Sequence, residues 1–443
     1  MHKILGIIVV VFLIQSCSDN DDSSSTPPSP QVKFTNTYGG RLKDSVNNVI
    51  STDDGGYAIV GFTQSNDGDI TGKTTTDFDI WLLKFDFNDQ LQWSKTFGGS
   101  NAEKAFKIIQ TSDKGFCIAS YTDSSDGDVS ENNGLSDIWI VKTDVSGNIL
   151  WEKSHGFSGI DQALSIIETS DDGLLISGVL DVSASNGDGN DKPSNKKHAG
   201  GDYWAIKLNV NGDKEWRRYF GGTFTDTAYD IIETNDNGFL LVGASDSNDV
   251  DISNNKGEYD FWVVKIDDSG TILWEKSYGG TQIDEAKSVL KSTDGNFLIV
   301  GDSRSNDTDI SNAKGAADVW LIKIANDGKI IWEKSFGGSS FDAGRHISPA
   351  QDGGFLIAGS SRSADGDLEL NQGQNDAWIL KVDTNGNLNW QKSIGGSEID
   401  FAYGITQLQD QSIIAVGESY SNNGDVLENK GFSDLLIVKI QVE

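Results

Sequence analysis

Seven acidic residues recur at one equivalent position along the chain and are the first candidates for chemistry. Each stands five residues after the start of a repeated glycine motif: Asp44, Glu103, Asp161, Asp226, Asp284, Asp342 and Asp400. Carboxylates that gather near one axis could bind a cation or raise one another's pKa. Aspartate also accepts backbone N–H groups and thereby fixes its own turn, which is the interpretation that we favour.

Closely spaced aspartates form a second acidic pattern, in loops that contain glycine. Its clearest copies are Asp67-Gly68-Asp69, Asp126-Gly127-Asp128 and Asp365-Gly366-Asp367. Ca²⁺ accepts about six to eight oxygen ligands in variable geometry, so these aspartates are candidate calcium ligands. The spacing is not that of an EF-hand loop, and the sequence requires no cofactor.

A third set of candidates comes from positions at which the repeated units differ. Eight residues after the first glycine the occupants are Asn47, Phe106, Leu164, Tyr229, Lys287, Arg345 and Tyr403. Aromatic and cationic side chains together suit a sugar face that carries a carboxylate or sulfate. The candidate ligand-binding residues are therefore Phe106, Tyr229, Lys287, Arg345 with its neighbour His346, and Tyr403. Tolerated drift around a solvated channel is the alternative.

The third unit is longer than the others through residues 190–200, which include Lys192, Lys196, Lys197 and His198. A basic loop on an acidic protein is a candidate contact with a ligand or partner, so Lys196 and Lys197 join the binding candidates. A tolerated insertion at a loop tip is the other interpretation.

The sequence contains no recognisable catalytic constellation. The histidines after the N-terminal segment, His155, His198 and His346, stand in dissimilar contexts, and no metal-ligand spacing joins them. Acidic residues are too numerous for any glycosidase-like pair to stand out. The interpretation leans away from an enzyme, and a glycan-cleaving hydrolase or lyase stays the alternative.

A repeated unit must position all of these residues. The glycine motif begins at residues 39, 98, 156, 221, 279, 337 and 395, at intervals of 59, 58, 65, 58, 58 and 58 residues. Each unit holds four β-rich runs separated by turn residues, for example residues 260–266 and 271–277 on either side of a turn ending at Gly270. Seven copies of four antiparallel strands predict an all-β, seven-bladed β-propeller. A solenoid is the second choice.

The two ends of the chain predict that the ring closes. The repeats begin with an outer strand near residues 32–38, where Phe34 takes the place that tryptophan holds in later copies. The chain ends on a third strand, residues 434–440. The N-terminal strand can therefore complete the last blade and remove the exposed strand edges that an open array would have.

Twelve tryptophans fall into two repeat-equivalent sets. One set precedes the glycine motif, and the other is Trp81, Trp139, Trp204, Trp262, Trp320 and Trp378. Repetition in six of seven units favours packing between blades over ligand binding. Cys117 is the only cysteine after residue 17 and lies in an apolar run, which predicts a core position.

Charge excludes several classes of partner. The 443 residues carry 67 acidic and 35 basic side chains, a net charge of −32. Nucleic acids and anionic lipid surfaces need basic protein surface, so neither is expected as a partner.

The N-terminus predicts secretion. Lys3 and the apolar residues 4–14 form a signal peptide over 1–16, too short to span a bilayer. The stretch Leu13-Ile14-Gln15-Ser16-Cys17 resembles a bacterial lipobox, which implies that Cys17 is acylated, as with palmitate. Residues 17–31 are acidic and then rich in serine and proline, which predicts a disordered tether before a domain at 32–443.

WxKxxGG, DGGFxIxG-like and DxWxxK segments recur over about residues 33–443, and together with the acidic residues 19–22 they resemble the repeat-propeller surface lipoproteins of the Bacteroidetes. The resemblance implies a lipid-anchored module on the outer membrane, exposed at the cell surface, that binds a polysaccharide or a protein of the envelope. A scaffold for other envelope proteins is a further alternative. The resemblance carries over no catalytic residue.

Overall fold

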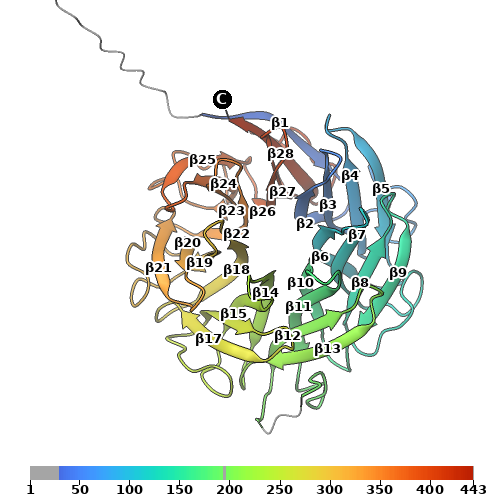
Figure 1. Ribbon diagram of the computed structural model, residues 1–443. Coiled ribbons are helices and arrows are strands. Elements are labelled where there is room, and N and C mark those ends of the chain that lie inside the picture. The colour runs from blue at the N-terminus through green and yellow to red at the C-terminus, as the bar shows by residue number, and fades with distance from the viewer. Residues whose placement is uncertain (1–28, 193–195, 443) are drawn as a thin grey trace, which may run out of the picture.

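The computed structural model describes residues 29–192 and 196–442 and consists of seven four-stranded antiparallel sheets. The sheets stand like blades around a central axis (Figure 1). This arrangement confirms the seven-bladed propeller. The signal peptide and Cys17 lie outside the described residues.

Each blade contributes one strand to each of four layers. The inner strands are β2 (Asp44–Ser51), β6 (Glu103–Gln110), β10 (Gln162–Glu168), β14 (Asp226–Glu233), β18 (Asp284–Lys291), β22 (Asp342–Pro349) and β26 (Asp400–Gln407). The second strands are β3 (Tyr57–Thr63), β7 (Phe116–Thr122), β11 (Leu174–Asp181), β15 (Phe239–Ser245), β19 (Phe297–Ser303), β23 (Phe355–Ser361) and β27 (Ile413–Ser419). The third strands are β4 (Asp79–Phe85), β8 (Asp137–Thr143), β12 (Gly201–Leu208), β16 (Asp260–Ile266), β20 (Asp318–Ile324), β24 (Asp376–Val382) and β28 (Asp434–Val442). The outer strands are β5 (Leu91–Phe97), β9 (Ile149–His155), β13 (Lys214–Phe220), β17 (Ile272–Tyr278), β21 (Ile330–Phe336), β25 (Leu388–Ile394) and β1 (Pro30–Tyr38).

The seventh blade joins the two ends of the chain. Its strand order is β26, β27, β28 and β1, and the register pairs Thr37 with Leu436. Figure 1 shows β1 in blue beside β28 in red. The expected closure by the N-terminal strand is confirmed, and the strand begins at Pro30, two residues before the expected domain boundary at 32.

The core lies between neighbouring blades. The central strands are almost continuously apolar because both of their faces are covered, as in Asp260–Ile266. The third-strand tryptophans are fully buried, and the indole N–H of Trp139 donates to Glu152 Oε2 at 2.7 Å. Their structural interpretation is thus confirmed. Cys117 is also fully buried, as expected.

Tryptophans of the outer strands connect adjacent blades at the rim. Gly147, in the turn between β8 and β9, has a φ of 75°, and a Cβ there would lie 2.8 Å from Trp93 of the preceding blade. Glycine is required at this turn because it adopts the positive φ and leaves room for the ring.

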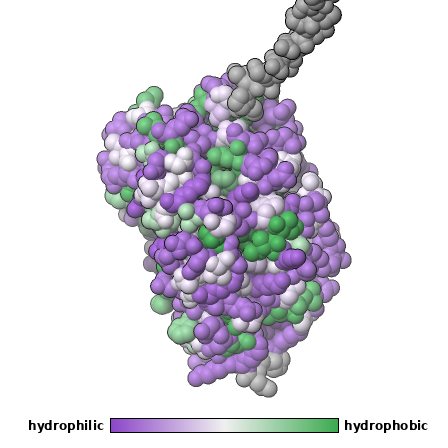
Figure 2. Space-filling view, turned by 90° about the vertical axis from the view of Figure 1, so that its left-hand side faces the viewer, coloured by the Kyte–Doolittle hydropathy of each residue, from purple (hydrophilic) through white to green (hydrophobic). Residues whose placement is uncertain are grey.

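The outer wall is mainly hydrophilic. On the side of β21 and β25, Figure 2 shows a polar surface with scattered small apolar patches. Within residues 29–192 and 196–442, none of the elements is a helix long and apolar enough to cross a membrane.

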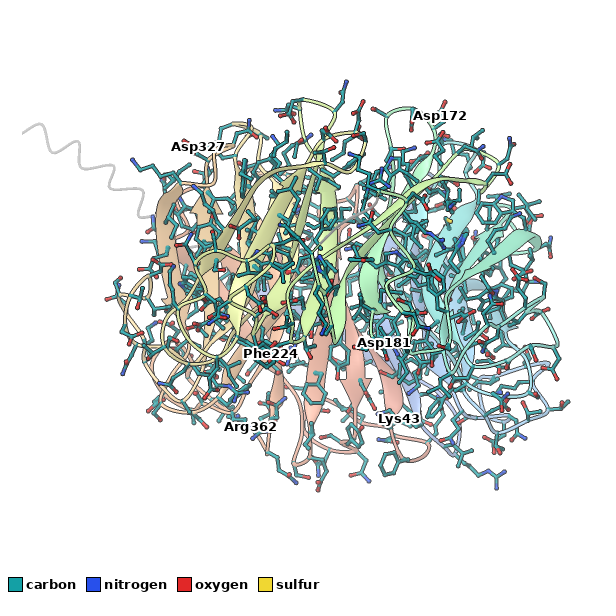
Figure 3. All side chains as sticks on the ribbon, turned by 90° about the horizontal axis from the view of Figure 1, so that it is seen from below. Lys43, Asp172, Asp181, Phe224, Asp327 and Arg362 are labelled. Carbon is teal, nitrogen blue, oxygen red and sulfur yellow. The ribbon has the colours of Figure 1, made fainter. Side chains whose placement is uncertain are left out.

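Different loops lie on the two faces of the propeller. Lys43, Asp181, Phe224 and Arg362 lie on one face, here called the entrance face, where the glycine motifs and the loops between second and third strands meet (Figure 3). Asp327, in a turn between third and outer strands, lies on the opposite face, here called the hairpin face. The inner strands run from the entrance face to the hairpin face.

Removal of residues 1–38 should open the ring, because β28 then presents unpaired backbone groups along its edge. We expect a clearly lower thermal unfolding midpoint and self-association, measured by calorimetry and by size-exclusion chromatography with light scattering. Removal of residues 1–28 alone is the matched control. A truncated protein that stays monomeric and as stable as this control would contradict closure by β1.

Candidate functional site

The seven recurrent carboxylates are structural and stand in pairs at the junctions between blades. At one junction Asp284 Oδ2 accepts the backbone N–H of Gly280 at 2.7 Å and the hydroxyl of Ser305 at 2.8 Å. Asp260 Oδ2 of the preceding blade accepts the N–H of Lys256 at 2.6 Å. A Cβ on Gly279 would lie 2.4 Å from Asp260 Oδ1 and 2.5 Å from Asp284 Oδ2, so the glycine makes room for both groups.

All seven junctions contain such a pair of buried carboxylates. The pairs are Asp434 with Asp44, Asp79 with Glu103, Asp137 with Asp161, Asp202 with Asp226, Asp260 with Asp284, Asp318 with Asp342, and Asp376 with Asp400. In each pair the strand-one carboxylate accepts a backbone N–H, which confirms the structural interpretation.

Burial makes these pairs unusually weak acids. Loss of hydration raises the pKa of Asp226 and of Asp260 to about 7, and the charge of the partner carboxylate adds to both shifts. Several Oδ1 atoms in the pairs, including those of Asp260 and Asp284, are buried without a hydrogen-bond partner. A proton on one member of a pair would supply the missing donor.

The pairs should make the protein more stable in mild acid. For members such as Asp226, Asp260 and Asp376 the pKa lies above the value of about 3.9 expected for aspartate in the unfolded chain, so at these groups the folded state binds protons more tightly than the unfolded state. The resulting stability is complete below pH 4 and is lost as pH rises through 6 and 7. The lowered pKa of about 2 at Asp171 affects stability only below pH 4. Burial lowers the pKa of His155 and of His346, so these two residues favour the higher pH within the window, but the carboxyls of the pairs outnumber them. Urea unfolding should therefore give a lower free energy of unfolding at pH 8 than at pH 5.

Asp260→Asn should reduce this slope because it removes one titrating group and keeps an acceptor for the N–H of Lys256. Asp327→Asn, on an exposed turn, removes the same charge and is the control. A slope that is flat between pH 5 and 8 in the unmodified protein would contradict the role assigned to the pairs.

The Asp-rich loops hold the glycine motifs in place. Asp67 Oδ1 accepts the N–H of Arg41 at 2.9 Å, and Asp69 Oδ2 accepts the N–H of Gly39 at 2.9 Å and the ammonium of Lys430 at 2.6 Å. The equivalents Asp126, Asp128, Asp365 and Asp367 accept backbone N–H groups of their own motifs. Among the described residues, no three His, Cys, Asp or Glu side chains converge on a possible metal position. Calcium binding by these loops stays a prediction.

The expected binding residues line the entrance half of the channel. Lys287 Nζ lies 3.7 Å from the ring centroid of Tyr229, on the adjacent blade. Tyr403 stacks on Phe401 with ring centroids 5.3 Å apart, and Arg345 Nη1 lies 3.7 Å from the buried Asp302 Oδ1. The charges of Lys287 and Arg345 both act on Asp302, and the charge of Arg345 also acts on Tyr403, so these side chains form one continuous band along four adjacent blades.

Phe106, the other expected aromatic residue, packs against Tyr121 of its own blade at 6.1 Å. It therefore adds a further aromatic surface to the same half of the channel.

Further cations lie over aromatic rings at the mouth of the channel. Lys104 Nζ is 4.2 Å from the ring centroid of Phe78 and 4.9 Å from that of Phe62. The guanidinium groups of Arg304 and Arg362, both exposed, lie 5.4 and 5.8 Å from Phe341. The sequence signal for these pairs was weak, because their members come from different strands and loops.

The basic loop of the third unit folds back onto the protein. Lys196 Nζ lies 2.5 Å from Asp251 Oδ1, and His198 Nδ1 lies 2.7 Å from Asp202 Oδ2. Burial alone would lower the pKa of His198, but the hydrogen bond to Asp202 and the charges of Asp202 and Asp251 together raise it. Lys197 is exposed. Of the two lysines, Lys197 is thus the better placed to meet a ligand.

One residue further along the inner strands, a polar layer crosses the channel. The occupants are Asn48, Lys107, Ser165, Asp230, Ser288, His346 and Gly404. A β-bulge precedes this position in every inner strand, and it brings two successive side chains toward the axis. Of these seven residues only His346 was a candidate predicted from the sequence, although this position also varies between the repeats.

Backbone groups of neighbouring blades bind to this layer. Asn48 Oδ1, Asp230 Oδ2 and His346 Nδ1 each accept the N–H of a residue on the next blade, at 3.3, 3.0 and 3.3 Å. Lys107 Nζ reaches across from two blades away to Asp230 Oδ1 at 3.2 Å. The layer therefore ties inner strands together through side chains that differ from blade to blade.

Comparison with known proteins supports the fold alone. No family model matches the sequence, and a search of characterised proteins gives no match. The WD40 domain of Neurospora crassa Pan2 has a TM-score of 0.51 and 10% identity, with 94% of this chain and 95% of that chain covered. BBS1N in complex with ARL6DN, and Sqt1 from Chaetomium thermophilum, have TM-scores of 0.48 and 0.45 at 8% and 11% identity. The alignment with BBS1N covers 94% of this chain and 97% of that chain, and the alignment with Sqt1 covers 88% of this chain and 82% of that chain. The chain is a seven-bladed propeller.

Proposed function

We propose that the protein is a lipid-anchored binding module of the outer membrane that holds a polysaccharide at its entrance face. The observation that carries the proposal is the set of cations over aromatic rings at the mouth of the channel, on a protein with a net charge of −32. Aromatic rings stack on sugar faces, and guanidinium and ammonium groups bind carboxylate or sulfate.

The overall charge narrows the class of polysaccharide. A densely charged polyanion would be repelled by the protein as a whole. A polymer with scattered acidic groups can place these at the cations while neutral sugars contact the rings. We therefore propose a polysaccharide with a moderate content of uronic acid or sulfate. The sequence offers no catalytic constellation, which favours binding over cleavage.

Replacement of the exposed guanidinium groups tests this proposal. Partially methyl-esterified galacturonan and glucuronoxylan, which carry scattered carboxylates, are the probes, and alginate, with a carboxylate on every sugar, is the densely charged comparison. All are titrated calorimetrically into the full chain. At least one of the two probes should bind, and more tightly than alginate. Arg304→Ala with Arg362→Ala should weaken that binding by about tenfold or more, because two charge-assisted contacts are lost. Lys329→Ala, which removes a cation from the hairpin face, should leave it unchanged. Failure of every acidic glycan to bind would overturn the proposal, and new reducing ends or unsaturated uronates would assign cleavage instead.

The anchor rests on the lipobox-like segment that ends at Cys17. Acyl chains on this residue would attach the propeller to the membrane through the segment that precedes β1. In bacteria that express the full chain, an alkyne-labelled fatty acid should be incorporated, and the protein should be digested by external protease on intact cells. Cys17→Ala should abolish the labelling and release the protein into the soluble fraction. Labelling that persists in this variant would contradict acylation at Cys17.

A further inference from the structure

A cavity of about 530 Å³ opens on the axis at the hairpin face, opposite the proposed polysaccharide site. Its rim includes Ser51, Ser112 and Pro349, which lie at or just beyond the ends of inner strands. Its floor is the polar layer, through Asn48, Lys107, Asp230, Ser288 and His346. The size is typical of a small-molecule site.

The only carboxylate of this floor is fully engaged. Asp230 Oδ1 accepts from Ser165 Oγ at 2.7 Å and from Lys107 Nζ at 3.2 Å. Its Oδ2 accepts from Ser288 Oγ at 2.9 Å and from the N–H of Val289 at 3.0 Å. With four donors around it, Asp230 presents little acceptor capacity to a ligand.

Three of the remaining floor residues offer donors, whereas Ser288 donates its hydroxyl hydrogen to Asp230. Lys107 has three N–H groups and uses one on Asp230. His346 accepts the N–H of Ile405 at Nδ1, and burial, with the nearby charge of Lys107, holds its pKa well below the ordinary value, so the neutral ring carries its hydrogen on Nε2. Asn48 uses its oxygen on the N–H of Ile108, which leaves its amide N–H groups. Within residues 29–192 and 196–442, no protein acceptor forms a hydrogen bond with these spare donor groups.

Floor and walls together define a ligand class. A group with oxygen acceptors matches the donors. A monoanion suits the pocket better than a dianion, since Asp230 already balances the charge of Lys107, and Asp53 and Glu168 add negative charge elsewhere on the lining. The partly exposed side chains of Ile50 and Ile109 line the wall. We propose that this pocket binds a small carboxylate, with the carboxylate on Lys107, His346 and Asn48 and the remainder of the molecule against the two isoleucines.

Variation between repeats supports a dedicated site. Asn48 binds the next blade by a contact that could be repeated around the whole ring if the layer served packing alone. Instead the chain places one lysine, one aspartate and one histidine there, each once. A ligand occupies one place in a ring and breaks its symmetry in this way.

Ligand-observed saturation-transfer NMR and calorimetry on the full chain test the proposal with hexanoate, glucuronate, hexan-1-ol and hexyl phosphate. Hexanoate or glucuronate should bind, and which of them binds more tightly distinguishes an aliphatic acid from an acidic sugar. Hexan-1-ol and hexyl phosphate should bind more weakly than the preferred carboxylate. No carboxylate binding at millimolar concentration, or equal binding of the alcohol, would overturn the proposal.

Matched variants locate the site. Lys107→Met should lower the carboxylate affinity by about tenfold or more, whereas Lys329→Met makes the same change at an exposed turn of the hairpin face and should leave the affinity unchanged. His346→Gln keeps an acceptor for the N–H of Ile405 and should also weaken binding, which provides a second readout if Lys107→Met unfolds. Circular dichroism verifies folding of each variant. Unchanged affinity in a folded Lys107→Met or His346→Gln protein would contradict the assignment.

Discussion

Pairing of β1 with β28 is the constraint on which the other features depend. Each blade buries its two apolar faces against its two neighbours. The seventh blade therefore has to pack against the first blade, just as the first packs against the second. The core between them combines Val46 and Tyr57 with Leu435 and Ile437, and Phe34 of β1 packs on its edge. Closure also fixes the radius of the channel. Contacts that cross it, such as Lys107 with Asp230, form only because blades far apart in sequence face one axis.

The same closure concentrates negative charge at the junctions between blades. Two carboxylates meet beside each first glycine, and backbone N–H groups and hydroxyls offset part of their desolvation. A second repeated device lies near the hairpin face, where buried third-strand lysines bind aspartates of the turns, as Lys265 binds Asp236 at 2.6 Å. Many acidic residues are therefore internal acceptors rather than surface charge. This explains how a chain with a net charge of −32 folds into a closed ring.

Features that repeat were predictable from the sequence, and features that depend on contacts between unlike units were not. Four β-rich runs per unit and the missing outer strand of the last blade led directly to the ring. Tryptophans such as Trp139 were recognised as packing residues because they recur. The cations over Phe341 were missed, since Arg304 and Arg362 belong to different blades and no spacing links them. The polar layer was largely missed because a β-bulge, which the sequence pattern does not reveal, turns a second side chain toward the axis.

The contrast between repeated and varied positions also separates structure from function within the channel. A residue that every blade needs is held by the same physical requirement seven times, as the carboxylate beside each glycine shows. A channel position has no such common requirement, because the contacts that its side chain makes across the axis and to a neighbouring blade differ around the ring, as that of His346 with Ile405 shows. Tyr229 beside Lys287, and Lys107 with His346, occupy such positions at different depths. The propeller thus supplies a symmetric frame whose channel has different side chains at its two ends: cations over aromatic rings toward the entrance face, and hydrogen-bond donors toward the hairpin face.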